Sequence, residues 1–183
     1  MAKKPRDNRS SRKERAPKEF FEELLHIARV TRVVKGGRRL RFKATVAIGD
    51  RKGRVAVGVG KSAEVATAVQ KAVADAKKNV LTIPLTDNLS VPHEVRVKHK
   101  AAKILIMPAG EGTGVKAGGV VRKILDLAGV HNVLSKRFGS TTRLVNAQAT
   151  MIALAELRAK PKKKVKKAEV VVEEVVEENP VAA

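Results

Sequence analysis

One segment, residues 36–62, alternates apolar and charged side chains so regularly that it restricts the folds open to the chain. The apolar positions of its first half are Leu40, Phe42, Ala44, Val46 and Ile48. The cations between them are Arg39, Arg41 and Lys43. Because a period of two places alternate side chains on opposite faces, the pattern predicts a half-buried antiparallel strand. After a turn at residues 49–53, Val55, Val57 and Val59 predict the next strand.

The flanking residues complete a first module that ends near residue 80. Apolar residues at 21, 24, 25 and 28 recur at helical spacing, which predicts a short helix over residues 18–28. Residues 30–35 predict a short strand, and Gly36 and Gly37 turn the chain into the long strand. Ser62 is predicted to cap a helix that runs to about residue 79. The expected order is helix, three antiparallel strands, helix.

A second module is expected after a connection that contains two prolines. Strands are predicted over residues 91–100 and 104–107, followed by a glycine-rich loop at 110–119. A helix is predicted over residues 120–127 with Gly129 as its C-cap, and a short strand over 130–133. Residues 140–142 begin a final helix that extends to about residue 160. Its predicted inward stripe is Leu144, Val145, Gln148, Ile152 and Ala155.

The expected fold class is α+β, with the chain divided into five parts. These are a disordered basic tail at 1–17, a first domain at 18–80, a linker at 81–92, a C-terminal α/β domain at 93–160, and a tail at 161–183 that is rich in Lys, then in Val and Glu. No apolar run approaches the roughly 20 residues that span a bilayer. The N-terminal residues lack the apolar centre of a secretory signal.

The charge of the chain indicates a polyanionic partner. There are 39 Lys and Arg against 18 Asp and Glu, a formal net charge of +21, and nucleic acid is the commonest partner for such an excess. The chain has no Trp, no Tyr and only four Phe, so it offers few aromatic platforms for stacking unpaired bases. We therefore expect contacts mainly to phosphates, 2′-hydroxyls and the shape of folded RNA. The absence of Cys excludes a disulfide framework and fits a reducing cytoplasm.

The candidate RNA-binding residues fall in four places. The first hairpin supplies Arg29, Arg32, Lys35, Gly36, Gly37, Arg38, Arg39 and Arg41. The second turn supplies Arg51, Lys52 and Arg54, and the expected helix start supplies Lys61 and Ser62. The glycine-rich loop and the helix after it supply Gly112, Gly114, Lys116, Arg122 and Lys123. Glycines let backbone N–H groups approach a phosphate closely, although tight packing of the loop against the helix would equally account for them.

Motifs that suggest enzymes are incomplete. Gly60, Lys61 and Ser62 resemble the end of a Walker phosphate loop, but that pattern needs a glycine where Val55 stands. Gly112, Gly114 and Ala117 fit a loose dinucleotide fingerprint, yet no acidic residue follows at about 20 positions. The four histidines share no metal-ligand spacing, and no nucleophile, base and acid are arranged together. We therefore expect no enzymatic activity, no cofactor and no metal.

Several separate motifs resemble one family, that of bacterial small-subunit ribosomal protein five. In the first module they are Gly37-Arg38, Phe42, Ala44, Ala47-Ile48-Gly49-Asp50, Gly53-Arg54-Val55, Gly58 and Gly60-Lys61. In the second they are Ala109 to Gly114, Ala117-Gly118-Gly119, Leu127 to Leu134 and Phe138-Gly139-Ser140-Thr141. The resemblance covers about residues 19–157 in order, and the tails lie outside it.

The resemblance implies a first domain like a double-stranded-RNA-binding domain and a second, small α/β domain with a left-handed βαβ crossover. It implies a cytoplasmic, ribosome-associated structural component that binds small-subunit ribosomal RNA near the decoding region. Its expected neighbours are ribosomal proteins four and eight of that subunit and, together with proteins three and four, the messenger RNA entry path. The family is linked with translational accuracy, and its loop matching residues 31–37 lies near the spectinomycin site. The alternative is a regulator outside the ribosome that binds double-stranded RNA through the first module alone.

Overall fold

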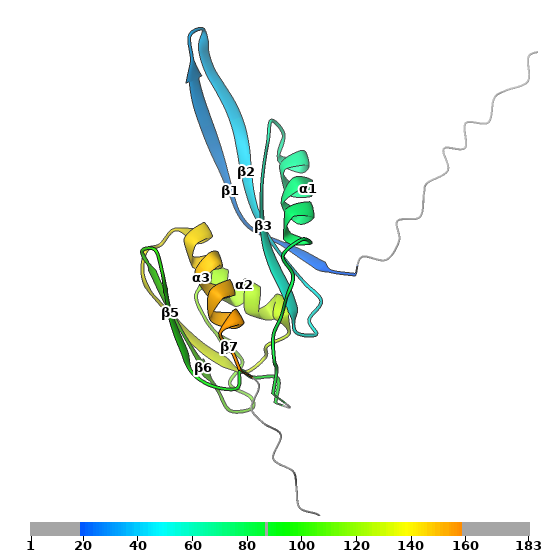
Figure 1. The fold of residues 1–183 in the computed structure, drawn as a ribbon, viewed down its shortest axis with the longest axis vertical. Coiled ribbons are helices and arrows are strands. Elements are labelled where there is room, and N and C mark those ends of the chain that lie inside the picture. The colour runs from blue at the N-terminus through cyan, green and yellow to red at the C-terminus, as the bar shows by residue number, and fades with distance from the viewer. Residues whose placement is uncertain (1–18, 87, 159–183) are drawn as a thin grey trace, which may run out of the picture.

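The long alternating segment lies in a hairpin that projects beyond the rest of the molecule (Figure 1). The structure, a computed structural model, describes residues 19–86 and 88–158, so the predictions for residues 1–17 and 161–183 lie outside the described residues. β1 (Phe21–Val34) and β2 (Gly37–Gly49) pair antiparallel along their whole length. β3 (Arg54–Ser62) and β4 (Leu81–Thr82) complete a four-stranded sheet in the order β1-β2-β3-β4.

The helix predicted over residues 18–28 is wrong, because residues 21–28 belong to β1. The apolar spacing that suggested a helix arises from a strand whose register shifts between Leu24 and His26. Of the apolar residues on the supposed helix face, Leu25 is buried, whereas Phe21 and Leu24 are exposed. Pairing with β2 satisfies the backbone of this segment, so tertiary context overrides the local pattern. The predicted strand at 30–35 is confirmed as the outer part of β1, and Lys35 and Gly36 form the turn.

The inner half of β2 is buried on both faces, so the prediction of a half-buried strand is wrong there. One face carries Ala44, Val46 and Ile48, which pack against α1 (Val65–Ala76). The other face carries Ala47, which packs in a core shared with the second module. Gly58 and Gly60 of β3 lie so close to α1 that a Cβ atom on either would collide with its backbone. Close contact of helix and sheet therefore requires glycine at these two positions.

The predicted N-cap at Ser62 is wrong. Pairing with Phe42 keeps Ser62 inside β3, and α1 begins three residues later with Glu64 at the cap position. The Ser62 hydroxyl instead accepts a hydrogen bond of 2.6 Å from Thr67 Oγ1. The helix itself is confirmed, although it ends at Ala76 rather than near residue 79.

The second module is a four-stranded sheet with two helices on one face (Figure 1). Its strands, in the order β5-β6-β8-β7, are β5 (Val95–His99), β6 (Ala102–Pro108), β8 (Val133–Gly139) and β7 (Val115–Lys116). The predicted helices are confirmed as α2 (Gly119–Ala128) and α3 (Arg143–Ala155), although α3 ends at Ala155 rather than near residue 160. Gly129 caps α2 with a φ of 83°. β7, α2 and β8 form a parallel βαβ unit, whose handedness stays a prediction. The α+β fold class is confirmed.

Two expectations for this module are wrong. A strand was expected at 130–133, but only Val133 enters β8, because the Val130 N–H bonds the Leu125 carbonyl in the α2 cap. The expected inward stripe of α3 is also misplaced. The residues that α3 buries are Asn146, Ala147, Ala149, Thr150, Ala153 and Leu154. Leu144, Gln148, Ile152 and Ala155 line an open groove of about 600 Å³ instead. Val145 alone of the stripe packs against the shared core.

One hydrophobic core joins the two modules. Leu25, Ala47 and Val55 of the first sheet belong to the same buried cluster as Ile124 and Leu127 of α2. At its edge the backbone N–H groups of Arg51 and Gly53 donate to the carbonyls of Leu127 and Ala128, each at 2.9 Å. The turn between β2 and β3 is therefore docked on the end of α2, which fixes the hairpin relative to the second sheet.

Candidate nucleic-acid interface

The register of the first sheet places five cations on one face of the projecting hairpin. Arg32 stands opposite Arg39, and Lys43 stands opposite Lys61. Arg41 shares this face because it lies two residues from both Arg39 and Lys43. We call these residues the hairpin face: Arg32, Arg39, Arg41, Lys43 and Lys61. The hairpin face lies on the side of the sheet that packs against the second module in the inner half of the same strands.

The hairpin face is positively charged and unneutralised. Among the described residues none of its five cations forms an ion pair. Arg32, Arg39, Arg41 and Lys61 line a shallow hollow of about 230 Å³ together with Val30 and Thr31. Like charges held this close repel one another, and a polyanion that binds them removes that repulsion.

The remaining hairpin candidates lie elsewhere on the same projection. Arg29 pairs with Phe42, and Arg38 pairs with Val33, which puts both arginines on the opposite face. Lys35 and Gly36 form the exposed turn, and Gly37 follows it with a φ of 143°. The structure therefore divides the predicted hairpin cluster between two faces and a tip.

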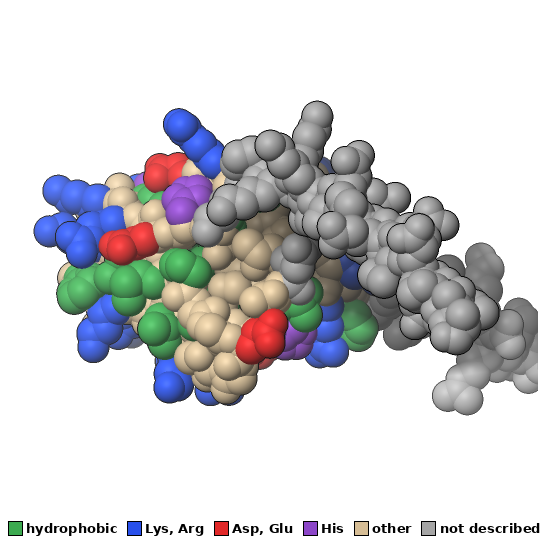
Figure 2. Space-filling view, turned by 90° about the horizontal axis from the view of Figure 1, so that it is seen from below, with side chains coloured by type: hydrophobic (Ala, Val, Ile, Leu, Met, Phe, Trp, Pro, Cys, Tyr) green, Lys and Arg blue, Asp and Glu red, His purple; other side chains and the backbone are tan. Residues whose placement is uncertain are grey.

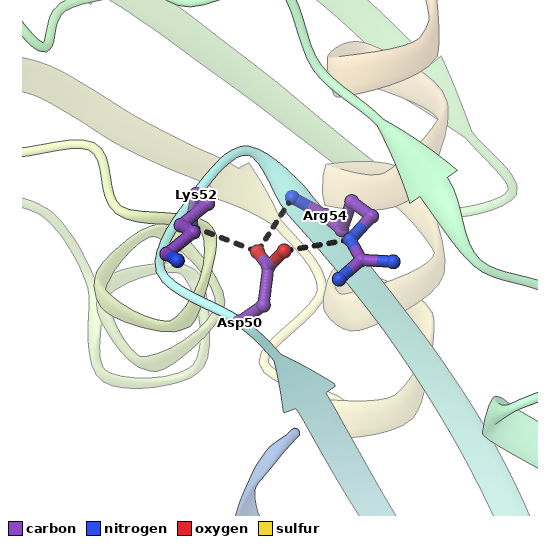
Figure 3. Close-up of polar contacts among 3 residues, drawn as sticks. All are labelled: Asp50, Lys52 and Arg54. Carbon is purple, nitrogen blue, oxygen red and sulfur yellow. Dashed lines mark hydrogen bonds and ion pairs between the residues drawn. The ribbon is translucent and has the colours of Figure 1, made fainter. Parts of the chain in front are cut away.

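The second turn is an internal support rather than a set of free cations (Figure 3). Asp50, whose side chain is 7 % exposed, accepts the Arg54 Nε–H at 2.6 Å. It also accepts the backbone N–H groups of Lys52 and Arg54 at 2.8 and 3.0 Å. The Arg51 and Arg54 guanidinium groups lie over the rings of Phe21 and Phe20. Of the three predicted residues here, only Lys52 has a side chain with no such engagement among the described residues.

The electrostatics of this turn make Asp50 a stabilising anion. Burial raises the pKa of Asp50, but the Arg54 hydrogen bond, the two backbone N–H groups and the Arg54 charge outweigh it. The net result is a pKa below the ordinary value of the carboxyl group. Because the folded pKa lies below the unfolded one, the contribution to stability is complete above about pH 4 and is lost as pH falls through the folded pKa.

Asp50→Asn is expected to lower the free energy of unfolding by about 1–2 kcal/mol at neutral pH. The amide retains one acceptor for the backbone but loses the charge that faces Arg54. Urea unfolding at pH 7 and at a series of lower pH values measures the difference between variant and wild type. The difference should shrink toward zero below about pH 4. A difference that stays constant over the whole series would show that the ionised form is not what stabilises the turn.

The glycine-rich loop is open. A Cβ atom at Gly110, Gly112, Gly114, Gly118 or Gly119 would meet nothing within 4 Å. Packing of loop against helix therefore does not account for these glycines. Positive φ angles of 79° and 70° account for Gly112 and Gly114, but not for the other three. The loop leads directly into the N-terminus of α2, where Gly118 provides no side-chain cap.

The cations near this loop differ in their availability. Lys116 is exposed on β7. Arg122 lies 3.9 Å from Asp126 in a solvent-exposed pair, which leaves it largely free to exchange partners. Lys123 is engaged within the protein, because its Nζ lies 2.8 Å from Glu23 Oε1 and donates to the Leu24 carbonyl. Lys123 thus fastens α2 to β1.

The RNA-binding residues predicted from the sequence do not include all the cations that the structure brings together. Lys43 belongs to the hairpin face, and the alternation of β2 that identified Arg39 and Arg41 also identifies it. Arg96, Lys98, Lys103 and Lys136 are exposed on the second sheet, where only the alternation of β5 gave a signal. Residues 19–86 and 88–158 hold no cluster of three His, Cys, Asp or Glu suited to a metal ion. No helix in these ranges is long and apolar enough to cross a membrane.

Comparisons with known proteins match both modules. The family described as "Ribosomal protein S5, N-terminal domain" matches residues 20–84, and "Ribosomal protein S5, C-terminal domain" matches residues 97–168. A small ribosomal subunit protein uS5c of Emiliania huxleyi is 48% identical over 155 residues, which cover 85% of this chain and 92% of the relative. A uS5 protein of Acaryochloris marina is 49% identical, covering 86% and 89%. A uS5c protein of Spinacia oleracea is 49% identical over 81% of this chain, which spans about half of that longer relative.

Proposed function

The chain belongs to the ribosomal protein S5 family, and from this membership we propose that the hairpin face and the glycine-rich loop hold it on ribosomal RNA. The protein is a structural constituent of the small ribosomal subunit and not an enzyme. Small-subunit ribosomal RNA and other ribosomal proteins are its partners. The observation that carries the proposed interface is the group of five cations without ion-pair partners among the described residues.

The hairpin face suits a folded RNA backbone. Its three arginines have planar, fork-shaped groups that can bind phosphate oxygens in pairs, and its two lysines add point charges. Projection of the hairpin from the core lets it enter a groove or a junction between RNA helices. Because the face has no aromatic residue, recognition there depends on phosphate position and RNA shape rather than on base stacking.

The glycine-rich loop suits a second phosphate contact. The open space around five glycines leaves backbone N–H groups accessible to an anion, except that of Gly114, which donates to Asn132 Oδ1. The first turn of α2 adds unpaired N–H groups and the positive end of the helix dipole. Lys116 and Arg122 lie beside this loop and add mobile charge. Gly112 would thus take part through its backbone N–H, whereas Gly114 would shape the loop through its positive φ.

The position of the protein within the small subunit follows from the family resemblance and is part of the proposal. The protein would lie near the decoding region, beside ribosomal proteins four and eight and near the messenger RNA entry path, in the cytoplasm. The loop of residues 31–37 lies at the tip of the hairpin, the position expected for a contact close to the spectinomycin site. A regulator outside the ribosome is not favoured, because the second module also matches the family.

Sedimentation of a cell lysate in a sucrose gradient tests the function. The chain is followed by antibody at low salt and at about 0.5 M salt. We expect it to migrate with the small subunit under both conditions, because many simultaneous contacts resist screening better than single ones. Loss of all co-migration at the higher salt would indicate a loosely bound factor. Absence from the subunit at low salt would overturn the ribosomal function itself.

A further inference from the structure

Within residues 19–86 and 88–158, no helix or strand covers one face of the second sheet. α2 and α3 pack on the other face, between the two sheets (Figure 1). We propose that the uncovered face, which we call the outer sheet face, is a separate RNA-binding surface that stacks an unpaired base on Phe138. This proposal rests on the proposed function only in that RNA is the partner. The surface is distinct from the hairpin face and meets the glycine-rich loop at Lys116.

The register defines which side chains share the outer sheet face. Lys98, Lys103 and Phe138 stand in one row across β5, β6 and β8. Arg96, Leu105 and Lys136 form the next row. Residues of the alternate positions, such as Val97 and Ile104, are buried against the helices, which confirms the sidedness. The members of the face are Arg96, Lys98, Lys103, Leu105, Met107, Lys116, Leu134, Lys136 and Phe138.

Phe138 differs from the other three phenylalanines. Phe20 and Phe21 lie under arginine guanidinium groups, and Phe42 packs against the cluster beneath α1. Phe138 is 46% exposed and has no recorded ring contact among the described residues. An exposed ring among cations is the arrangement that sheet-based RNA-binding modules use, where the ring takes a base and the cations take its phosphates.

The charge of the face complements RNA. Its positions within β5, β6, β7 and β8 carry five cations and no Asp or Glu, and Glu94 lies just before β5. In the view from below, Lys and Arg side chains line the left edge together with hydrophobic and some acidic ones, on the side on which β5 lies in Figure 1 (Figure 2). Cations two residues apart on one strand stand roughly 6.7 Å from each other. That spacing is comparable to the distance between successive phosphates of an extended strand.

An acidic protein is the competing occupant, and the centre of the face argues against it. The core of a protein–protein interface is depleted of charged residues, and lysine in particular is rare there. Here Lys136 stands at the centre, opposite Leu105, and Lys103 stands opposite Phe138 near one end of the face. Leu105 is only 8% exposed, so it offers little apolar surface to a protein partner. Cations around one exposed ring are better suited to a nucleotide.

The placement is tested by photocrosslinking in assembled small subunits that contain Phe138→p-benzoylphenylalanine. Ile152, which is 36% exposed and lies in the groove along α3, receives the same replacement as a control. We expect a ribosomal RNA adduct from position 138 that exceeds the one from position 152. An adduct to protein, or no adduct although the chain migrates with the subunit, would overturn this inference and leave the proposed function intact. Absence of the chain from the subunit would overturn both.

Affinity measurements separate stacking from charge. Binding of the full-length protein to full-length small-subunit ribosomal RNA is measured over a range of salt concentrations. Phe138→Ala and Phe138→Leu are each expected to lose roughly tenfold in affinity without a change in salt slope, whereas Phe138→Tyr keeps the affinity. Lys98→Gln with Lys103→Gln should flatten the log–log slope by about 1.4, because each contact to a single strand contributes about 0.7. Full affinity in Phe138→Leu, with a melting temperature equal to wild type, would refute base stacking.

Discussion

Replacement of Arg32, Arg39 and Arg41 together by glutamine is expected to weaken binding to small-subunit ribosomal RNA about a hundredfold at roughly 0.15 M salt. Each neutralised phosphate releases counterions and contributes a slope of about −0.9 in a log–log plot, as in duplex DNA. Three lost contacts should therefore flatten the slope by about 2.7. Filter binding of the purified chain over a series of salt concentrations measures both quantities. Glutamine keeps much of the side-chain length, so the change is mainly one of charge.

A matched control removes the same charge from another surface. Lys71, Lys77 and Lys78 are exposed on α1 and just after it, away from the hairpin face. Their combined change to glutamine should alter the slope by less than about 1, because only long-range attraction is lost. Equal effects of the two triple variants would mean that the net charge, and not the hairpin face, determines the affinity.

Gly129→Ala is expected to lower the free energy of unfolding by about 4 kcal/mol. Two costs add at this position. Alanine disfavours the φ of 83°, and its Cβ would collide with the backbone carbonyl of Arg51. Relief of that collision separates the β2–β3 turn from α2 and strains the hydrogen bonds between them. Urea unfolding of the purified full-length chain measures the loss.

Gly114→Ala is the matched control for this stability prediction. Gly114 has a similar φ of 70°, but a Cβ atom there meets nothing within 4 Å. Only the conformational cost of about 1 kcal/mol should therefore appear. The difference between the two variants measures the packing of one module on the other. Equal losses would show that the docked turn contributes nothing beyond backbone strain.

Much of the fold could be predicted because local patterns and tertiary structure agree. The alternation in β2 and β3, the glycine after α2 and the polar residues before α3 each have one local interpretation, and the structure confirms them. The helix at 18–28 failed because a register shift in β1 imitates helical spacing. The stripe on α3 failed for another reason. That helix buries mostly small residues, together with Asn146 and Leu154, while Leu144 and Ile152 line a groove. A rule that places all large apolar residues on one buried face does not describe this arrangement.

The candidate site could be predicted by residue type but not by face. Charge and alternation identified the hairpin, yet the separation of Arg29 and Arg38 from Arg32 depends on strand register. Sequence alone also could not show that Arg54 and Lys123 form internal ion pairs. The partner of Lys123, Glu23, lies 100 positions away in the chain. The outer sheet face was missed because Lys136 and Phe138 of β8 lie far along the chain from β5 and β6, and only strand pairing brings Lys98, Lys103 and Phe138 into one row.

A cryo-electron microscopy reconstruction of the small subunit from cells that express this chain tests the central claim most directly. The account predicts that the side chains of Arg32, Arg39 and Arg41 lie within hydrogen-bonding distance of ribosomal RNA phosphates. It also predicts that the hairpin keeps the orientation set by the docked β2–β3 turn. A chain bound to the subunit with its hairpin face directed into solvent, or covered by protein alone, would contradict the account.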